Sequence, residues 1–242
     1  MVSRSANPAL NKSTFITAGR TTTSSSAMTI EGTVNKTALL LGLILVTASY
    51  AWSNQSVLLL TGGIIGGLII AFVTVFKKEW SGITAPLYAL FEGLFLGSIS
   101  AIFERFYPGI VTNAILLTFG TLFALLIAYR SGIIKATENF KLGVFAATGG
   151  IFFLYMISIV LGFFGIGIPF MHSNGPIGIG ISLVIVVIAA LNLVLDFDFI
   201  EQGAEHGAPK YMEWYGAFGL MVTLIWLYIE ILHLLSKLYS RD

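Results

Sequence analysis

Three acidic side chains lie within the last and most apolar part of this sequence. Asp196 and Asp198 lie near the end of one apolar run, and Glu230 lies well inside the next. An ionised carboxylate costs several kcal/mol to hold in hydrocarbon, so each acid must face a protein interior, share a proton or pair with a cation. We therefore take these acids as the candidate functional residues and the rest of the chain as their scaffold.

The chemistry of such acids depends on whether they meet. Two carboxyl groups close together in a low dielectric cannot both ionise cheaply, so they titrate as a unit. When the pair is protonated, the two carboxyl groups can share a hydrogen bond and close an ion pathway between the helices. Ionised, the pair offers the hard oxygen ligands that Ca²⁺ prefers. Asp196 or Asp198 with Glu230 would form a pH-gated cation site, with Asp196 and Glu230 as Ca²⁺ ligands, although proton relays in transporters use similar acids.

Asp196 and Asp198 are two residues apart, about 200° round a helix, so they cannot both face one partner. Asp196 shares a face with Asn192 and Ile200, whereas Asp198 is nearer the polar Gln202. We favour Asp196 as the buried member. The structural alternative is that both are interfacial acids at the end of a membrane span.

Other polar groups extend the candidate site into a possible proton or ion path. Glu92 lies near the middle of the third apolar stretch, Asn192 lies one turn before Asp196, and His233 follows Glu230 by three residues. For Glu92 and Glu230 the alternative is a neutral carboxylic acid that ties helices together by hydrogen bonds.

Catalysis is not expected. The sequence contains no cysteine and no Gly-x-Ser-x-Gly nucleophile motif. Its three histidines, His172, His206 and His233, fall on different loops and spans, so they cannot form one zinc site. We expect no enzyme activity and no cofactor, with Ca²⁺ as a transported or bound ion.

The composition belongs to the membrane class. Of 242 residues, 56% are hydrophobic and 10% are charged, against about 25% charged in soluble proteins. The net charge of +1 and the lack of basic runs exclude nucleic acid as a partner. The partners we expect are the lipid bilayer, Ca²⁺ and H⁺, with a membrane protein as a further possibility.

Seven stretches are long and apolar enough to cross a bilayer, which needs about 20 residues each. They predict an all-α fold, a bundle of seven transmembrane helices. The expected spans are 36–52, 57–76, 83–106, 110–130, 140–165, 177–200 and 214–238.

Basic residues in the loops predict the orientation. With the N-terminus in the cytoplasm, ten Lys and Arg residues fall on the cytoplasmic side and three on the far side, the positive-inside pattern. Seven spans then place the C-terminus outside. A six-span alternative would make the last stretch re-entrant.

Residues 1–34 differ in composition from the rest, being rich in Ser and Thr and poor in large apolar groups. We expect a disordered cytoplasmic tail there, with a transit peptide as the alternative, and a membrane domain over residues 35–242. Within the spans, the glycines at 62–63, 66–67, 149–150, 178 and 180 are expected to let helices approach closely.

Three segments carry a family resemblance: Trp226-Leu-Tyr-Ile-Glu-Ile-Leu-His-Leu-Leu with its acid, the run Leu195-Asp-Phe-Asp-Phe-Ile-Glu201 before it, and Phe91-Glu-Gly-Leu-Phe-Leu-Gly97. They resemble the Bax inhibitor (transmembrane Bax inhibitor motif) family. The N-terminal segments Ser5-Ala-Asn-Pro-Ala-Leu10 and Met28-Thr-Ile-Glu-Gly-Thr-Val-Asn-Lys-Thr37 are similar to a bacterial branch of that family. The resemblance spans about Met28 to Leu238. It implies a seven-helix bundle with the last helix central and a pH-sensitive Ca²⁺ leak. It also implies an aspartate pair on the last two helices as the pH sensor.

Carried onto this sequence, the first aspartate of that pair falls on Asp196 or Asp198 and the second on Glu230. The chain differs from the family pattern in having Glu at the second position and extra residues, 203–209, between the two acids. Its second span also contains no acid.

The resulting hypothesis is a pH-sensitive Ca²⁺ leak channel or cation/H⁺ exchange pathway in a bacterial inner membrane, gated by these carboxylates. An organellar membrane is the alternative location. The alternative function is a non-transporting membrane regulator that binds a membrane-protein partner, such as a quality-control protease, and whose buried acids are structural.

Overall fold

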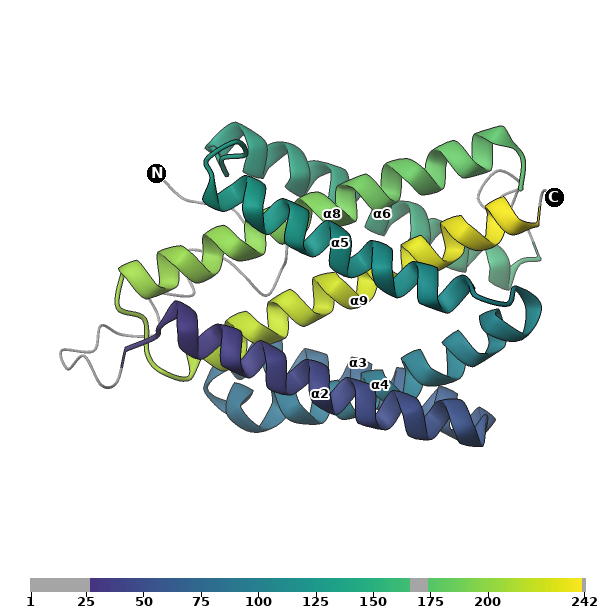
Figure 1. The fold of residues 1–242 in the computed structure, drawn as a ribbon, viewed down its shortest axis with the longest axis horizontal. Coiled ribbons are helices and arrows are strands. Elements are labelled where there is room, and N and C mark those ends of the chain that lie inside the picture. The colour runs from purple at the N-terminus through teal and green to yellow at the C-terminus, as the bar shows by residue number, and fades with distance from the viewer. Residues whose placement is uncertain (1–26, 166–173, 241–242) are drawn as a thin grey trace. The chain divides into compact units, whose positions relative to one another are not determined.

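A computed structural model describes residues 27–165 and 174–240. Within these residues the chain forms seven long helices, each long and apolar enough to cross a membrane, which confirms the predicted fold class (Figure 1). The described helices, with a short 3-10 turn, η2, are α2 (Ile30–Asn54), α3 (Val57–Phe76), η2 (Lys78–Trp80), α4 (Ser81–Phe106), α5 (Ile110–Arg130), α6 (Glu138–Phe163), α8 (Pro176–Glu205) and α9 (Met212–Tyr239).

The first helix begins earlier than predicted. α2 starts at Ile30, because the hydroxyl of Thr29 accepts a hydrogen bond from the backbone N–H of Gly32 at 3.0 Å and caps the helix. Residues 30–34, assigned from composition to a disordered tail, are therefore helical. Residues 1–26 of that tail lie outside the described part of the chain.

The last helix is continuous. α9 runs unbroken over 28 residues, about 42 Å at 1.5 Å per residue, which exceeds the hydrocarbon thickness of a bilayer. A re-entrant last segment, the six-span alternative, does not fit this helix. α9 is also the most buried of the seven spans: 67% of its most apolar window is buried within the protein, against 11–44% for the others.

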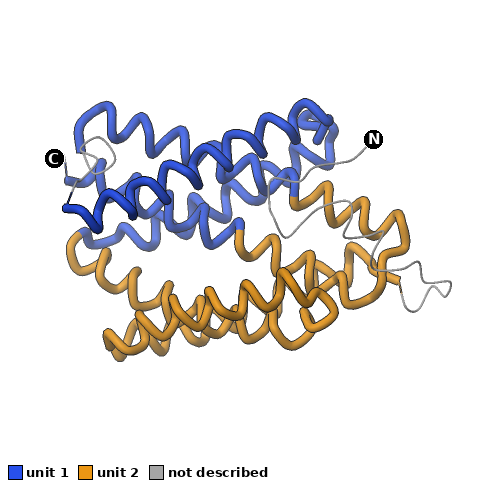
Figure 2. The backbone as a smooth tube through the Cα atoms, turned by 180° about the vertical axis from the view of Figure 1, so that it is seen from behind, with its two compact units in different colours: residues 1–7, 107–195, 223–242 blue, residues 8–106, 196–222 orange. Residues whose placement is uncertain are grey.

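The chain divides into two compact units, named as in Figure 2. Unit 1 contains residues 107–195 and 223–242, with 1–7, and unit 2 contains residues 8–106 and 196–222. Helices α5 and α6 therefore belong to unit 1, and α2, α3 and α4 to unit 2. Helices α8 and α9 contribute residues to both.

Glycine allows the close packing inside unit 2, where α4 packs against both α2 and α3. A Cβ atom added at Gly93 would lie 1.9 Å from Thr47 Oγ1, and one at Gly97 would lie 2.1 Å from the carbonyl oxygen of Ala48. These two glycines are one turn apart, the small-xxx-small spacing of close helix pairs in membranes. The α2–α4 contact therefore depends on Gly93 and Gly97, which the sequence analysis did not identify as packing glycines.

The predicted packing glycines divide into two groups. On α3, a Cβ at Gly63 would lie 2.6 Å from the backbone nitrogen of Phe95, so Gly63 packs directly against α4 as predicted. In contrast, a Cβ at four of the predicted glycines would meet no atom of the described structure within 4 Å: Gly62, Gly149, Gly150 and Gly180. The prediction was wrong for these four, because spacing alone does not show which side of a helix faces a neighbour.

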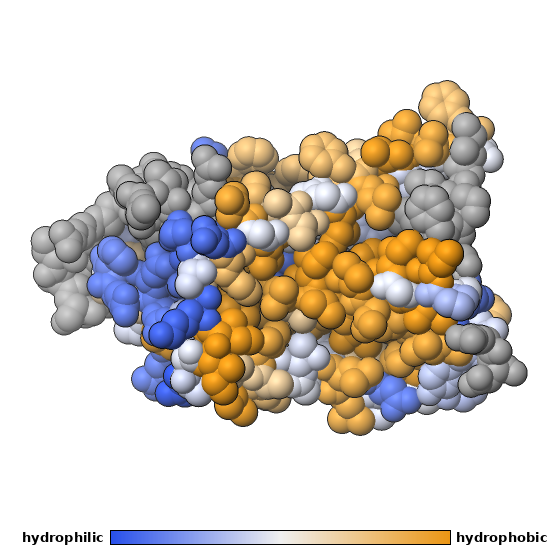
Figure 3. All heavy atoms as spheres, turned by 90° about the horizontal axis from the view of Figure 1, so that it is seen from above, coloured by the Kyte–Doolittle hydropathy of each residue, from blue (hydrophilic) through white to orange (hydrophobic). Residues whose placement is uncertain are grey.

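The surface of the protein suits hydrocarbon. Large apolar side chains are exposed along the spans, for example Leu68 on α3, Leu116 on α5 and Phe153 on α6, which are 58%, 65% and 66% exposed. Figure 3 shows hydrophobic side chains over most of the face in view and hydrophilic ones mainly toward its ends. In water such a surface would aggregate, whereas in a bilayer it contacts lipid. The protein is a multi-pass membrane protein.

The glycine contact gives a matched test of packing. We expect Gly97→Ala to destabilise the protein by about 1–3 kcal/mol, because the new methyl group would overlap backbone atoms of α2. Gly62→Ala on α3 is the control, since a Cβ there meets nothing within 4 Å and alanine is the better helix former. Thermal unfolding in detergent should show a lower midpoint for Gly97→Ala alone. Equal midpoints for both variants would contradict the close contact.

Candidate functional site

Glu230 is buried in the last span and hydrogen-bonded on one oxygen. Its side chain is 5% exposed. The hydroxyl of Tyr155, on α6, donates to Glu230 Oε1 at 2.7 Å, and the indole N–H of Trp226, one turn earlier on α9, donates to the same oxygen at 3.0 Å. Two donors on one oxygen fix the orientation of the carboxyl group and leave its second oxygen, Oε2, for a proton or a cation.

A second polar contact in unit 1 joins α8 to α6. Asn192 is 2% exposed, and its side-chain amide donates to Thr148 Oγ1 at 2.9 Å and to the carbonyl of Ile188 at 2.8 Å. Sequence analysis placed Asn192 in a possible ion path, and the structure gives it a definite role in helix pairing. Thr148 was not identified from the sequence.

The two aspartates of α8 differ in burial. Asp196 is fully buried, at 0% exposure. Asp198 is only partly buried, and its Oδ2 accepts a hydrogen bond from the amide of Gln202, one turn later, at 2.5 Å. This arrangement agrees with the expectation that Asp196 is the buried member and that Asp198 lies near Gln202. The physical reason is their 200° separation round the helix.

The predicted carboxylate pair falls on two different units. Asp196 and Asp198 belong to unit 2, and Glu230 belongs to unit 1. Among the described residues, no group of three or more His, Asp or Glu side chains is arranged to hold a metal ion. The pairing of Asp196 or Asp198 with Glu230, and their role as Ca²⁺ ligands, therefore stay predictions.

Glu92 and the described histidines differ in burial and surroundings. Glu92, on α4, is partly buried, interacts with Tyr88 one turn earlier, and lies against Gly67 of α3, where a Cβ would be 2.6 Å from its Oε1. His233 is exposed on α9. His206, near the end of α8, is also exposed, and its Nδ1 lies 2.7 Å from the carbonyl oxygen of Gln202. His172 lies outside the described residues.

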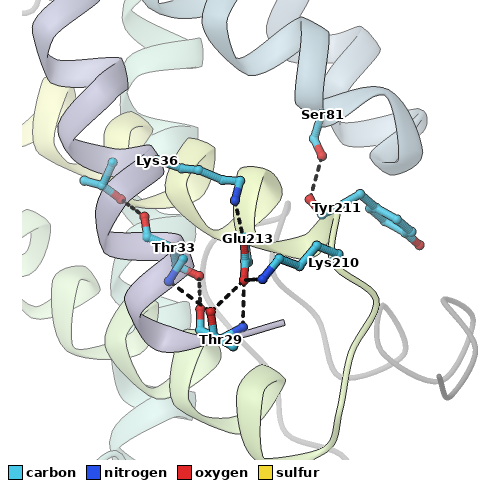
Figure 4. Close-up of polar contacts among 9 residues, drawn as sticks. Thr29, Thr33, Lys36, Ser81, Lys210, Tyr211 and Glu213 are labelled. Carbon is cyan, nitrogen blue, oxygen red and sulfur yellow. Dashed lines mark hydrogen bonds and ion pairs between the residues drawn. The ribbon is translucent and has the colours of Figure 1, made fainter. Parts of the chain in front are cut away.

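Glu213, in the first turn of α9, is an acid that is bonded through both of its carboxylate oxygens (Figure 4). Its side chain is 0% exposed. Oε1 accepts from the backbone N–H and the hydroxyl of Thr29, at 2.9 and 2.7 Å, and pairs with Lys210 Nζ at 2.8 Å. Oε2 pairs with Lys36 Nζ. Two ammonium groups and two neutral donors thus stabilise one ionised carboxylate.

Neighbouring contacts extend this Glu213 cluster to three helix starts of unit 2. The backbone N–H of Met28 donates to the carbonyl of Ala208 at 2.6 Å, and Ser81 Oγ, at the start of α4, donates to the carbonyl of Tyr211 at 3.0 Å (Figure 4). A Cβ at Gly32 would lie 2.2 Å from Glu213 Oε1, so glycine makes room for the carboxylate. The Glu213 cluster therefore fixes where α2, α4 and α9 begin.

Local sequence patterns indicate only some of the contacts that the sequence analysis missed. Trp226 stands four residues before Glu230, the spacing of one helical turn, so its contact could have been foreseen. Glu213 and Lys36 occur near the ends of predicted spans but 177 positions apart in the chain, and only folding shows that they meet. Tyr155 is one of many aromatic residues in the spans, and nothing in its local sequence indicates a partner.

The sequence matches a family model described as Bax inhibitor 1 like over residues 7–240. No curated protein and no solved structure matches it significantly.

We expect Glu213→Gln to destabilise the protein by about 3 kcal/mol, because it leaves two ammonium groups facing a neutral amide in a buried position. Glu205→Gln, at the exposed end of α8, is the matched control. Thermal unfolding in detergent should show a clearly lower midpoint for Glu213→Gln only. A cluster of no structural importance would give two equal midpoints.

Tyr155→Phe removes one donor from Glu230 without changing the ring. We expect a loss of about 1.5–3 kcal/mol, the usual size for a hydrogen bond to a charged group. Tyr50→Phe on the exposed face of α2 should have no effect. In a Glu230→Gln background the cost of Tyr155→Phe should shrink, and an undiminished cost in that double-mutant cycle would show that the two side chains do not act together.

Proposed function

The chain belongs to the Bax inhibitor 1 like family, and we propose that it conducts Ca²⁺ across a bacterial inner membrane, as a pH-sensitive leak or in exchange for protons. The observation that supports this proposal is Glu230, a carboxyl group buried in a membrane span. A group so costly to bury is retained in membrane proteins mainly where ions or protons pass.

The local geometry of Glu230 suits reversible protonation and cation binding. Tyr155 and Trp226 both donate to Oε1, so the carboxyl group holds its position in either protonation state. Ionised, its Oε2 is a hard oxygen ligand of the kind Ca²⁺ prefers, and protonated, it carries no charge to attract a cation. We infer that protonation closes the pathway.

Asp196 is the proposed second acid of the gate. Asp196 is fully buried, and it is one of the residues to which the family resemblance points. It lies on α8, the helix preceding α9 in the chain. Asp198, bonded to Gln202 and partly exposed, is the weaker candidate. Two interacting acids would lose their protons in two macroscopic steps, so the pH response would belong to the pair and not to either residue alone.

We also propose that the N-terminus lies in the cytoplasm. With alternating spans, the helix ends on that side carry more Lys and Arg than those on the far side, which supports this orientation by the positive-inside rule. Among the described residues, the basic side chains assigned to the cytoplasm are Lys36, Lys77, Lys78, Arg130, Lys135, Lys141 and Lys210, and those assigned to the far side are Arg105 and Lys237.

Ca²⁺ flux into proteoliposomes of the purified protein, at pH 6 and pH 8, tests the proposal. We expect faster flux at pH 8 than at pH 6, because the proposed gate closes on protonation. Glu230→Gln and Asp196→Asn should remove the pH dependence and reduce flux at least tenfold at pH 8, whereas Asp198→Asn should change it little.

Each variant is first checked for a single peak on size exclusion and for its unfolding midpoint, so that a loss of flux is not a loss of folding. Glu205→Gln again provides the exposed control. If well-folded wild-type protein passes no ion at either pH, the transport proposal fails. Its buried acids would then be structural, and the protein would act through a membrane-protein partner.

A further inference from the structure

Helices α6 and α8 touch at one place within unit 1 and stand apart at another. Val144 of α6 packs with Leu195 of α8, and the side-chain amide of Asn192 donates to Thr148 Oγ1. From this contact toward the start of α8, a groove of about 540 Å³ separates the two helices. The groove is therefore closed near the middle of α6 and extends into the half of the membrane in which α8 begins.

The groove is lined by apolar side chains and glycines from one stripe of each helix. Five of the lining residues lie between Ile177 and Ile185 of α8, and four come from α6: Ala147, Gly150, Ile151 and Leu154. Their spacing places these four on one face of α6. Thr148 and Tyr155, which bond to α8 and α9, lie one residue and about 100° further round the helix. The groove therefore lies beside the polar contacts of unit 1 and not among them.

The floor of the groove is buried, whereas its rim is open. Ile151 and Ile185 form the floor at 7% and 5% exposure, and Gly150 and Gly180 on the rim are exposed. A Cβ at either glycine would meet no atom of the described structure within 4 Å, so the missing side chains leave space unfilled. A buried water needs about three polar partners, and the described residues that line the groove carry no polar side chain. The groove therefore suits an apolar ligand.

The length of the groove decides between the apolar ligands that a bilayer offers. Residues 177–185 rise about 12 Å along α8, close to half of the roughly 30 Å hydrocarbon core. A helix of another membrane protein is about 10–12 Å wide and crosses the whole core. It would extend over the closed contact of Thr148 and Asn192, where no groove receives it. An acyl chain is thinner and ends near the middle of the bilayer, as the groove does.

We propose that this groove is a lipid-binding site, which holds one acyl chain of a phospholipid from the leaflet in which α8 begins. The inference goes beyond the proposed ion pathway and does not depend on it. Because the hydrophobic effect does not favour the groove over bulk lipid, packing supplies the preference. An empty groove loses the dispersion contacts of its walls, whereas a seated chain contacts both helices at once.

A phospholipid with a photoactivatable diazirine in one acyl chain tests the site. The protein is reconstituted in phosphatidylethanolamine–phosphatidylglycerol vesicles that contain a small fraction of this probe, illuminated, and digested for peptide mass spectrometry. In the wild type we expect segment 177–185 to be labelled at least about threefold more than the exposed α5 residues Leu116 and Leu117, a preference of about 0.7 kcal/mol.

Substitutions that fill the groove should remove the excess labelling. Gly150→Phe is read from the unaltered α8 segment, Gly180→Phe is read from the unaltered α6 segment 147–154, and each should reduce labelling to the level of α5. Gly149→Phe is the matched control, because a Cβ there also meets nothing within 4 Å but Gly149 is not among the lining residues. Phenylalanine is a better helix former than glycine, so unfolding midpoints should not fall.

Native mass spectrometry in detergent gives a second readout. Wild type and Gly149→Phe should retain one more phospholipid than Gly150→Phe or Gly180→Phe. Equal labelling of segment 177–185 and of α5 in the wild type would overturn the proposal, even if a filled variant failed to fold. An excess that persists in both Gly150→Phe and Gly180→Phe would overturn it as well, because the label would then report lipid outside the groove.

A second copy of the chain is the other occupant that these experiments can reveal. The sequence contains no cysteine, so Val184→Cys, at a lining position that is 57% exposed, supplies a single thiol. We expect Val184→Cys to stay monomeric under oxidation in vesicles. Disulfide-linked dimers together with no excess labelling of the groove would replace the lipid site by an interface between copies.

Discussion

The free-energy cost of a carboxylate in hydrocarbon is the constraint on which this structure depends most. Two buried acids of α9, Glu213 and Glu230, are placed where that cost is reduced, each in a different way. Glu213 is surrounded by two ammonium groups and two neutral donors. Glu230 receives two neutral donors on a single oxygen. The more completely compensated acid is suited to holding structure, and the less compensated one to binding and releasing ions.

Helix α9 carries both kinds of acid. Its first turn contributes Glu213 to unit 2, and its later turns contribute Glu230 and Lys237 to unit 1. The Glu213 cluster fixes the start of α9. The second half of the same helix carries Glu230, the acid of the proposed ion site. Helix α9 is also the most buried of the seven spans.

The glycines show how packing is achieved where no hydrophobic effect acts between helices. In lipid, helices associate through close van der Waals contact. A glycine at the contact therefore stabilises a helix pair more than an additional apolar side chain would. Gly93 and Gly97 bring α4 against α2, and Gly63 brings α3 against α4. Gly149, Gly150 and Gly180 are also glycines within membrane spans, but they make no such contact. Glycine content by itself therefore does not locate a helix pair.

The sequence by itself determined the class of fold. Hydrophobic length is a local property, because a span needs about 20 apolar residues whatever surrounds it, and seven such stretches gave the seven helices. It also predicted that the two neighbouring aspartates differ in burial, because 100° per residue places Asp196 and Asp198 on different faces of the helix. Family resemblance was likewise readable from local motifs and agrees with the matched family.

Only the tertiary structure decided which polar groups meet. The contacts of Glu213 with Thr29 and Lys36 join residues more than 170 positions apart, and that of Glu230 with Tyr155 joins residues 75 positions apart. No periodicity in the sequence specifies such pairs, because the helix that faces a given acid depends on how all the spans pack. Thr29 has two roles. It caps α2, and its hydroxyl donates a hydrogen bond to Glu213, a contact that only the folded chain brings about.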